Sequence, residues 1–376
     1  MNNYHEHKIP ILSFYSGGGF MDMGFEQAGF EIVWTNEYDK DFVKLHAAGI
    51  TSWRKSQGNE IKAEIFNTKS IIEVSSKEIL AEAFPKGKPE NFGMIGGPPC
   101  QDFSMNGSLK GFDGERGKLT VVYFDKILEI KPTFFVMENV TGLMKRKESK
   151  GYLQTLIDRV AKEYHIDYEK LNSLNFGVPQ HRERMFFIGI RKDCISKIII
   201  DQTPFGKWFP FPINEKYHNA ATKYNWCKQI SFGHSLTKPH GIPYELCVES
   251  CLVTEDDIQT IPNANEIFKL YKPVSELMKI AEGETKRPSF KRLHRFRYSP
   301  TACYGNNEVH LHPYLHRRLS LREALRIQGV SDDYILPTEL SLSKKFKMVG
   351  NGVPVPLAKA VAQSIMEFLS IHKIHN

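Results

Sequence analysis

The stretch ILSFYSGGGFMDMGFEQAGFEIVWTNEYD, residues 11–39, restricts the fold more than any other part of the sequence. It predicts a strand, a glycine-rich turn, a helix and a second strand that ends at Glu37. In a doubly wound sheet, ligands bind beyond the carboxyl ends of the strands. Gly17 and Gly19 would let the turn backbone approach a nucleoside, and Glu37 would accept hydrogen bonds from ribose hydroxyls. A turn with only a structural role is the alternative, because glycine marks most sharp turns.

The spacing of these glycines separates two kinds of nucleoside cofactor. A dinucleotide-binding G-x-G-x-x-G turn needs glycine at position 22, which is Asp22, and Gly24 falls two residues late. A nucleoside without a pyrophosphate, such as S-adenosyl-L-methionine, tolerates this pattern better. The turn therefore favours an S-adenosylmethionine site over a nicotinamide site.

Short apolar strands alternate with helix-length amphipathic segments through the first half of the chain. Strands are expected at IPILSFY, EIVWTNEY, FGMIGG, PTFFVMEN and MFFIGIR, with helices from about Met21 and from Asp41. This alternation is typical of βαβ units. The predicted fold class is therefore α/β, a Rossmann-like parallel sheet with helices on both faces.

The second half of the chain is less regular until its end. From about residue 192 to residue 313, prolines, aromatics, His and Asn recur without a sustained period, which indicates a loop-rich domain with short strands. LSLREALRIQG then predicts a helix capped by Ser320, with Glu323 at the capping-box position and Gly329 at its end. PLAKAVAQSIMEFLSIHK predicts a last amphipathic helix.

Charge and cysteine usage narrow the class of partner. The chain of 376 residues has a formal net charge of +7, and the run from Lys286 to Arg297 holds six Lys or Arg and no acid. Such a run indicates a polyanion partner, with a solvated basic face as the alternative.

The six cysteines are dispersed without zinc-ligand spacing, so no metal is expected. The sequence shows no signal peptide and no apolar run long enough for a bilayer, which predicts a cytoplasmic protein without membrane contact.

A set of reactive side chains is expected at one edge of the sheet. Cys100 follows an apolar run and the rigid sequence Gly-Gly-Pro-Pro, which places it at the carboxyl end of a strand. FFVMENV ends a second strand in Glu138, and the period-two spacing of Arg182 and Arg184 puts both on one side of a third. Each has a structural alternative: a buried free cysteine, a surface acid or a salt-bridged strand face.

These residues and their surroundings resemble a known family, the C5-cytosine-specific DNA methyltransferases of bacterial restriction-modification systems. The resemblance is carried, in the family's order, by FYSGGGFMDMGFEQAGFE, GGPPCQDFS, RGKL, ENVTGL, FGVPQHRERMFFIGIR, RLSLREALRIQG and GNGVPVPLAKAVAQSI. The sequence departs from the family at Ser13, where an acid is usual, at Phe20, where a second glycine is usual, and at Ser70, where an acid commonly contacts adenine.

The resemblance implies transfer of a methyl group from S-adenosylmethionine to C5 of a flipped-out cytosine in a specific double-stranded DNA sequence, leaving S-adenosyl-L-homocysteine. Cytosine C5 is a poor nucleophile, so Cys100 would first add covalently to C6 while Glu138 hydrogen-bonds or protonates N3. Arg182 and Arg184 would bind O2 and neighbouring groups of the base. The apolar approach to Glu138 predicts that burial raises the pKa of this carboxyl.

The family's positions also imply a cofactor pocket, a DNA-contacting set and a domain order. The cofactor residues are Tyr15, Gly17, Gly19, Glu37, Tyr38, Pro99, Leu119, Asn351 and Val353. The DNA-contacting residues are Gln101, Ser104, Arg116, Gln180, Lys291, Arg292, Arg295 and Arg297. Residues 1–192 and 338–376 would form the catalytic and cofactor-binding domain, and residues 193–337 an inserted target-recognition domain.

The expected partners are double-stranded DNA and a cognate restriction endonuclease acting on the same site, for a monomeric, nucleoid-associated protein of the cytoplasm. Two other functions stay open at this point. One is a transfer-RNA cytosine-5 methyltransferase with the same catalytic core, and the other is a catalytically inactive homologue that binds DNA. A nicotinamide oxidoreductase is disfavoured by Asp22 and by the setting of Cys100.

Overall fold

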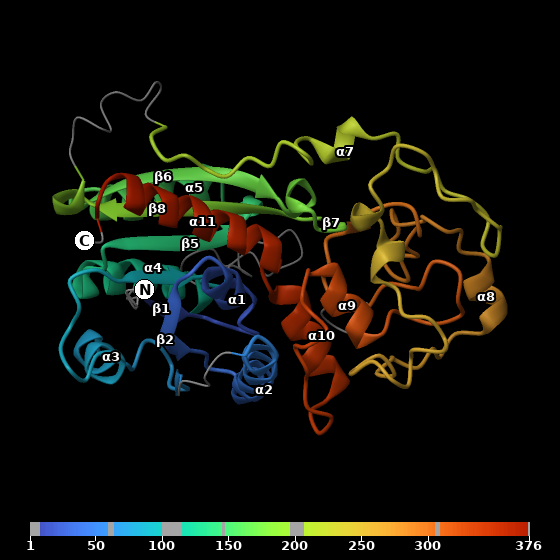
Figure 1. Ribbon diagram of the computed structural model, residues 1–376, viewed down its shortest axis with the longest axis horizontal. Helices are drawn as coiled ribbons and strands as arrows, with labels where there is room; N and C mark the ends of the chain where they lie inside the picture. Colours follow the sequence, from blue (N-terminus) through green and yellow to red (C-terminus); the bar gives the residue numbers. More distant parts are fainter. Residues whose placement is uncertain are drawn as a thin grey trace, which may run out of the picture.

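A layered region built on a β-sheet lies beside a region dominated by loops (Figure 1). The computed structural model describes residues 8–58, 64–99, 115–144, 147–195, 207–304 and 309–374, with the backbone alone for 115–117 and 147–149. Within these residues, no helix combines the length and the apolar character that crossing a lipid bilayer requires.

The sheet has seven strands in the order β3-β2-β1-β4-β5-β8-β6. The strands are β1 (Pro10–Phe14), β2 (Glu31–Asn36), β3 (Ile65–Asn67), β4 (Gly93–Gly96), β5 (Phe134–Val140), β6 (Tyr164–Asn172) and β8 (Glu183–Arg191). The pairs from β3 to β5 are parallel, as predicted. The sheet is thus mostly parallel, and β8 is the exception to the predicted parallel order, because it runs antiparallel to both of its neighbours. Residues 173–182 are too few for the helical crossover that a parallel β6–β8 pair would need.

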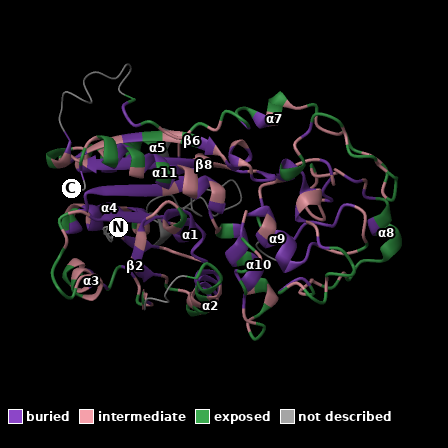
Figure 2. Cartoon of the chain, viewed as in Figure 1, coloured by how far each residue is buried: buried purple, intermediate pink, exposed green. Residues whose placement is uncertain are grey.

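Helices cover both faces of the sheet, because the side chains of each strand alternate between two apolar layers. Along β1, Ile11 faces the core shared with α1 (Phe20–Gln27) and α11 (Val355–Ile371). The next residue, Leu12, faces the core shared with α3 (Ser76–Ala83), α4 (Glu115–Ile130) and α5 (Lys147–Val160). Purple strands between partly exposed helices show this burial in Figure 2.

The end of the chain returns to its beginning. Helix α11 packs along α1, and a Cβ at Gly24 would lie 2.5 Å from the Cβ of Ala358, so only glycine allows this approach. The predicted last helix is confirmed, with Pro354 as its N-cap. Residues more than 300 positions apart in the sequence thus form one layer of the sheet region.

The described part of residues 207–320 holds little regular structure, as the loop-rich prediction stated. Its helices and strand are short: α7 (Ala220–Lys223), α8 (Val274–Met278) and β9 (Ser299–Pro300). Strand β9 pairs with β7 (Gln180–His181), which joins this region to the sheet region beside β8.

A third apolar core lies between the two regions. It combines Phe20 of α1 and Leu45 of α2 (Lys40–Ser56) with Leu293 of the loop-rich region. Helices α9 (Leu321–Ile327) and α10 (Leu342–Asn351) also contribute to it. The capping box of Ser320 and Glu323 at the start of α9 is present as predicted. Because this core is shared, the domain limits at 193 and 337 stay a prediction.

Candidate active site

An ion pair stands at the carboxyl end of β5. Glu138 lies near the end of that strand, and Arg184 lies near the start of the antiparallel neighbour β8. The Nε of Arg184 is 2.8 Å from Oε1 of Glu138, with side-chain exposures of 13% and 12%. Burial raises the pKa of Glu138, and the charges of Arg184 and Arg182 oppose this shift only in part. The direction is the one predicted from the apolar approach strand.

The chain that leads to Cys100 passes directly beside Glu138. Strand β4 ends next to β5, and a Cβ on Gly97 would lie 3.1 Å from Oε2 of Glu138. The side chain of Asn139 donates a hydrogen bond of 3.4 Å to the carbonyl of Pro98. The described residues stop at 99, so the predicted site residues Cys100, Gln101 and Ser104 lie outside them, as does the side chain of Arg116.

Arg182 occupies a different position from the one expected. It lies between β7 and β8, is 1% exposed, and donates to the backbone carbonyls of Ala302 and Asn351, each over 3.3 Å. Its guanidinium therefore joins three separate segments, and burial together with the nearby charge of Arg184 lowers its pKa. These contacts hold the residue before β8 in place, and the predicted contact of Arg182 with the base stays a prediction.

The glycine turn after β1 has the predicted conformation. Gly17 and Gly19 have φ values of 56° and 71°, which side chains other than glycine rarely adopt. The carboxylate of Glu37 accepts hydrogen bonds from the backbone N–H of Gly17 at 3.0 Å and of Asp39 at 2.8 Å. Burial raises the pKa of Glu37, while these two backbone donors oppose the shift.

The turn fits a nucleoside of the S-adenosylmethionine type. A carboxylate has about four lone-pair positions, so the two hydrogen bonds to Glu37 leave acceptor capacity for ribose hydroxyls. A Cβ built on Gly17 meets no atom within 4 Å, so the space in front of the turn is open. The donor set and the open space agree with the cofactor that the sequence predicts.

The other predicted cofactor residues surround this turn. The hydroxyl of Tyr15 donates to the carbonyl of Leu119 at 2.9 Å, and Tyr38 is 71% exposed. Asn351 is exposed and Val353 buried at the start of the C-terminal segment. That segment packs on the turn. A Cβ on Gly352 would meet the ring of Phe20, and a Cβ on Gly18 would meet the sulfur of Met348. Pro99 is half-buried at the end of the segment that leads to Cys100.

The structure shows the surroundings of the three departures from the family pattern. The hydroxyl of Ser13 donates to Oδ1 of Asp22 at 2.7 Å, so an acid from α1 stands beside the strand end where the family has one. The ring of Phe20 is buried and meets the ring of Tyr334 edge-on. The third departure, Ser70, opens a turn through a hydrogen bond of 2.8 Å from the N–H of Glu73 to its carbonyl.

The predicted DNA-contacting set divides into buried and accessible residues. Gln180 is fully buried, and its amide bonds with the carbonyl of Ile327, the side chain of Gln328 and the N–H of Ala302. These bonds hold the join between the two regions together, and the assignment of Gln180 to DNA contact stays a prediction.

Arg292 is buried in a similar way. It is 1% exposed, its guanidinium lies over the ring of Phe232, and all three of its nitrogens donate to backbone carbonyls. The accepting carbonyls are those of Leu277, Ile280, His312 and Leu315. Its hydrogen-bonding capacity is used inside the loop-rich region, which leaves it unable to face phosphates.

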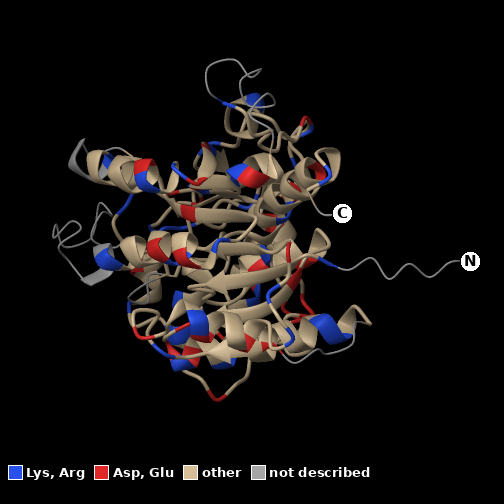
Figure 3. Ribbon diagram, turned by 90° about the vertical axis from the view of Figure 1, so that its left-hand side faces the viewer, with Lys and Arg blue, Asp and Glu red and all other residues tan. Residues whose placement is uncertain are grey.

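Three basic residues of the predicted set keep some access to solvent. Arg295 is held by the buried carboxylate of Glu282, with Nη2 2.8 Å from Oε2, while Lys291 and Arg297 are half-buried. Arg297 borders a cavity of about 320 Å³ that His181, His294, Tyr298 and Thr301 also line. This cavity lies beside the β7–β9 pair. At the opposite end of the molecule, blue ribbon segments of Lys and Arg are interspersed with red segments of Asp and Glu among the described residues (Figure 3).

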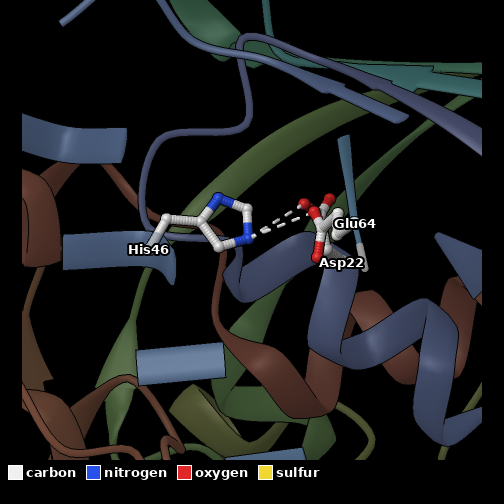
Figure 4. Close-up of side chains that lie close together, drawn as sticks. All are labelled: Asp22, His46 and Glu64. Carbon is white, nitrogen blue, oxygen red and sulfur yellow. Dashed lines mark ion pairs between the residues drawn. The ribbon is translucent and has the colours of Figure 1, made fainter. Parts of the chain in front are cut away.

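Sequence reasoning missed a buried polar cluster beneath the glycine turn. Asp22, His46 and Glu64 face one another there, as Figure 4 shows. Asp22 was noted only as the residue that breaks a glycine pattern. The three residues come from three elements and share no local motif, so spacing along the sequence contains no signal for them. Burial lowers the pKa of His46 to about 3, which keeps its imidazole neutral near pH 7.

A mostly parallel sheet, with a glycine turn after β1 and an acid after β2, defines the class: a Rossmann-like, S-adenosylmethionine-dependent methyltransferase. The particular family follows from comparison with known proteins. The chain belongs to the C-5 cytosine-specific DNA methylase family, whose model matches residues 9–367. It is a DNA (cytosine-5-)-methyltransferase.

Relatives of known type extend over nearly the whole chain. The Type II methyltransferase M.NmeDI of Neisseria meningitidis serogroup C is 37% identical over 372 residues, which cover 97% of this chain and 85% of that protein. The Type II methyltransferase M.FnuDI of Fusobacterium nucleatum is 32% identical, covering 96% of this chain and 95% of that protein.

Solved structures agree on the fold. A structure from E. coli, described as a DNA modification methyltransferase encoded within a prophage, aligns with a TM-score of 0.67 at 21% identity and covers 96% of this chain and 100% of its own. The DNMT2 of Spodoptera frugiperda aligns with a TM-score of 0.58 at 16% identity, covering 97% of this chain and 100% of its own. At these sequence identities, the similarity to solved structures shows the fold alone.

Proposed function

We propose that this protein methylates C5 of a flipped-out cytosine in a specific double-stranded DNA sequence, through a covalent bond between Cys100 and C6. The observation that carries the proposal is the Glu138–Arg184 ion pair, which stands beside the Gly97–Pro98 backbone that leads to Cys100. Membership of the DNA methylase family supports it.

A thiol next to a carboxyl suits this substrate, because C5 of cytosine becomes electron-rich only after a nucleophile adds to C6. The sulfur of Cys100 bonds to C6, and N3 takes a proton as the ring double bond shifts. S-adenosylmethionine, when bound at the glycine turn, supplies the methyl group that C5 accepts. C5 then gives its proton to water, the S–C6 bond breaks to regenerate the thiolate of Cys100, and N3 returns its proton to Glu138.

Glu138 and Arg184 have separate parts in this sequence. Arg184 holds Oε1 of Glu138, so Oε2, on the side of Gly97, is the oxygen free to carry a proton to N3. Burial raises the pKa of Glu138, which makes its protonated form more available than that of an exposed carboxyl. The guanidinium of Arg184 also stabilises negative charge that enters the ring.

The DNA contact is proposed for the loop-rich region together with the segment after Cys100. Attack on C6 comes from above the ring plane, so the target base has to leave the stack. Lys291, Arg295 and Arg297 would face phosphates, and the cavity beside Arg297 offers aromatic and polar side chains to a nucleotide. Gln101, Ser104 and Arg116 complete the proposed set.

Covalent trapping tests the central step. A duplex with 5-fluorocytosine at the target should form a stable adduct with the protein, because fluorine cannot leave as the C5 proton does. Cys100→Ser should form no adduct and lose turnover while retaining DNA binding. Cys303→Ser is the matched control, since it removes an exposed thiol elsewhere in the chain and should trap normally. Trapping by Cys100→Ser would overturn the assignment of the nucleophile.

Bisulfite sequencing of plasmid DNA from cells that express the protein reports both the modification and its sequence. Methyl transfer from labelled cofactor to transfer RNA but not to unmethylated plasmid would replace DNA by RNA as the substrate. If calorimetry detects no binding of the cofactor while the protein still binds DNA, the result would support an inactive homologue instead.

The cellular setting follows from the same proposal. The relatives named above are Type II methyltransferases, which supports a companion endonuclease acting on the same sequence. The protein would act as a nucleoid-associated monomer in the cytoplasm. Light scattering after size exclusion tests the monomer, and a dimer at micromolar concentration would contradict it.

A further inference from the structure

A closed polar cluster lies directly beneath the cofactor turn. Asp22 belongs to α1, His46 to α2, and Glu64 immediately precedes β3. Their side chains are 1%, 0% and 2% exposed, so bulk water does not reach them. Figure 4 shows the imidazole pointing at the two carboxylates. Three elements that are distant in sequence thus direct one atom each toward a common point.

These facing atoms have no hydrogen-bond partner among the described residues. They are Oδ2 of Asp22, Nε2 of His46 and Oε1 of Glu64. The imidazole nitrogen lies 3.6 Å from the Asp22 oxygen and 3.8 Å from the Glu64 oxygen, which is too far for a hydrogen bond. Buried polar atoms in folded proteins are rarely left unsatisfied, so the cluster lacks a component at its centre.

The formal charges indicate the sign of that component. The carboxylates of Asp22, Glu26 and Glu64 share the site with one guanidinium, that of Arg54, and with the imidazole of His46. With the carboxylates and the guanidinium ionised and the imidazole neutral, the cluster carries two negative charges in excess, which a buried site does not sustain without a counterion or protons. One divalent cation would balance the excess.

The donor atoms have the spacing of metal ligands. Zinc bonds imidazole nitrogen and carboxylate oxygen at about 2.0–2.2 Å, which at the tetrahedral angle separates neighbouring donors by about 3.3–3.6 Å. The two measured separations are 3.6 Å and 3.8 Å, and all three atoms lie within 4.8 Å of one another. We propose that Asp22, His46 and Glu64 bind a divalent transition-metal ion of the zinc class.

The remaining carboxylate oxygens are oriented by partners of their own. The hydroxyl of Ser13 donates to Oδ1 of Asp22 at 2.7 Å, and Nη1 of Arg54 lies 2.8 Å from Oε2 of Glu64. Each carboxylate is thereby turned so that its other oxygen faces His46. Partners of this kind around the ligands are a regular feature of metal sites in proteins.

The ion would have a structural role beside the cofactor turn. A Cβ on Gly19 would lie 2.3 Å from Nε2 of His46, so the turn rests directly on the imidazole. The hydroxyl of Tyr334 donates to the carbonyl of Gly18 at 2.7 Å and fixes the other side. Metal at this site joins α1, α2 and the segment before β3 beneath the turn, without contact to the reacting atoms proposed above.

The test uses the full-length protein stripped of metal by a chelator and exchanged into chelator-treated buffer. Zn²⁺ is then added during calorimetry, and the metal content is measured after gel filtration. We expect one Zn²⁺ per chain and a rise in Tm that depends on the Zn²⁺ concentration. Absence of saturable binding by the stripped protein would overturn the proposal and leave a cluster neutralised by protons.

Two variants locate the ion. Asp22→Asn and Glu64→Gln keep the side-chain size and an oxygen for Ser13 or Arg54, and each should weaken Zn²⁺ binding by more than about tenfold. Cys303→Ser is the control, because an exposed thiol is an alternative zinc ligand, and it should bind as the unaltered protein does. Equal affinity in all three variants would refute the site.

Spectroscopy decides the ligands even if a variant fails to fold. Co²⁺ in the unaltered protein should give ligand-field bands in the visible without the near-ultraviolet charge-transfer band of a thiolate ligand. A thiolate band would assign the metal to a cysteine and contradict the proposal.

Discussion

The sheet region and the loop-rich region satisfy their buried backbone by different means. In the sheet, ladder hydrogen bonds pair the backbone groups, and the side chains that fill the layers, such as Leu12 and Met94, are apolar. In the loop-rich region, charged side chains supply the bonds. Arg292 donates to four carbonyls, and Arg322 of the adjoining α9 donates to three. Irregular backbone has no ladder, so its buried groups need partners from side chains.

The same contrast holds for buried acids. Burial dominates at Glu138 on the sheet edge and raises its pKa. At Glu323 burial also acts to raise the pKa, but Arg317, His312 and the N–H of Ser320 lower it overall. One carboxyl is thus poised for proton transfer, and the other is held ionised as a structural acceptor. The comparison predicts that changes in the sheet edge alter chemistry, whereas changes in the loop-rich interior alter stability.

Glu138→Gln should have the largest effect on activity. The amide keeps an oxygen for Arg184 but cannot deliver a proton to N3, so turnover should fall by about 10²–10⁴-fold. The free energy of unfolding should change little, because the substitution replaces a carboxyl whose charged form is disfavoured by burial with a neutral amide of similar size. Single-turnover methylation and urea unfolding measure the two quantities. A large fall in the free energy of unfolding with an unchanged rate of methylation would contradict the proposed contrast between the two regions.

Arg292→Lys should have the largest effect on stability. An ammonium group cannot reproduce the fork that reaches four carbonyls, and leaving several of them unsatisfied should cost about 3 kcal/mol. Arg287→Lys is the matched control on the same segment, since Arg287 contacts Glu284 at a partly exposed position. Urea unfolding of both variants gives the comparison, and equal stabilities would show that buried arginine is dispensable there.

The pH dependence of methylation should follow Glu138. Its folded pKa is raised, so the protonated carboxyl prevails below that pKa and is lost as the pH rises through it. On the alkaline side the rate should fall by about tenfold per pH unit. Glu138→Gln, measured over the same range, should lack this limb. Persistence of the limb in the variant would assign it to another group.

Acid unfolding should begin in the loop-rich region. The pKa of Glu323 is lowered in the folded protein, so its stabilising effect is full above the pKa of the unfolded chain and is lost as the pH falls through the folded value. Hydrogen exchange as the pH is lowered should therefore open α9 before β4 and β5. Simultaneous opening would argue for one cooperative unit.

Lys69→Ala should have the smallest effect of these changes. Its ammonium pairs with Glu78 on the sheet region's surface, with exposures of 59% and 33%. Solvent and salt screen such pairs, so no measurable change in unfolding free energy is expected. A clear loss in a chemical denaturation series would mean that surface pairs matter as much as the buried ones.

Much of the sheet region was predictable because its signals are local. Apolar runs predicted strands β1, β2, β4 and β5. The glycine-rich sequence predicted the turn at which Glu37 accepts a hydrogen bond from Gly17, and the capping box predicted the start of α9. The approach strand of Glu138 predicted the direction of its pKa shift. The strand β8 was predicted at MFFIGIR, but its antiparallel direction was not, since strand direction depends on the length of a connection that no apolar period reports.

The roles of the buried arginines were not predictable in the same way. In the sequence, Arg182 stands beside a predicted catalytic residue and Arg292 stands in a basic run. In the structure, both guanidiniums donate to backbone carbonyls of distant segments. Whether a guanidinium faces phosphate or the interior depends on what the chain packs around it. The same reason hid Asp22, His46 and Glu64, whose facing atoms belong to separate elements.

By itself the sequence determined the class of fold, the glycine turn and the candidates for catalysis, because these follow from apolar period, glycine conformation and side-chain type at strand ends. Only the tertiary structure decided which polar groups meet. It joined Glu138 to Arg184, enclosed Arg182 and Arg292, and gathered three unpartnered ligand atoms under the turn. Such meetings depend on distances between segments remote in sequence, which packing of the cores sets and no local pattern encodes.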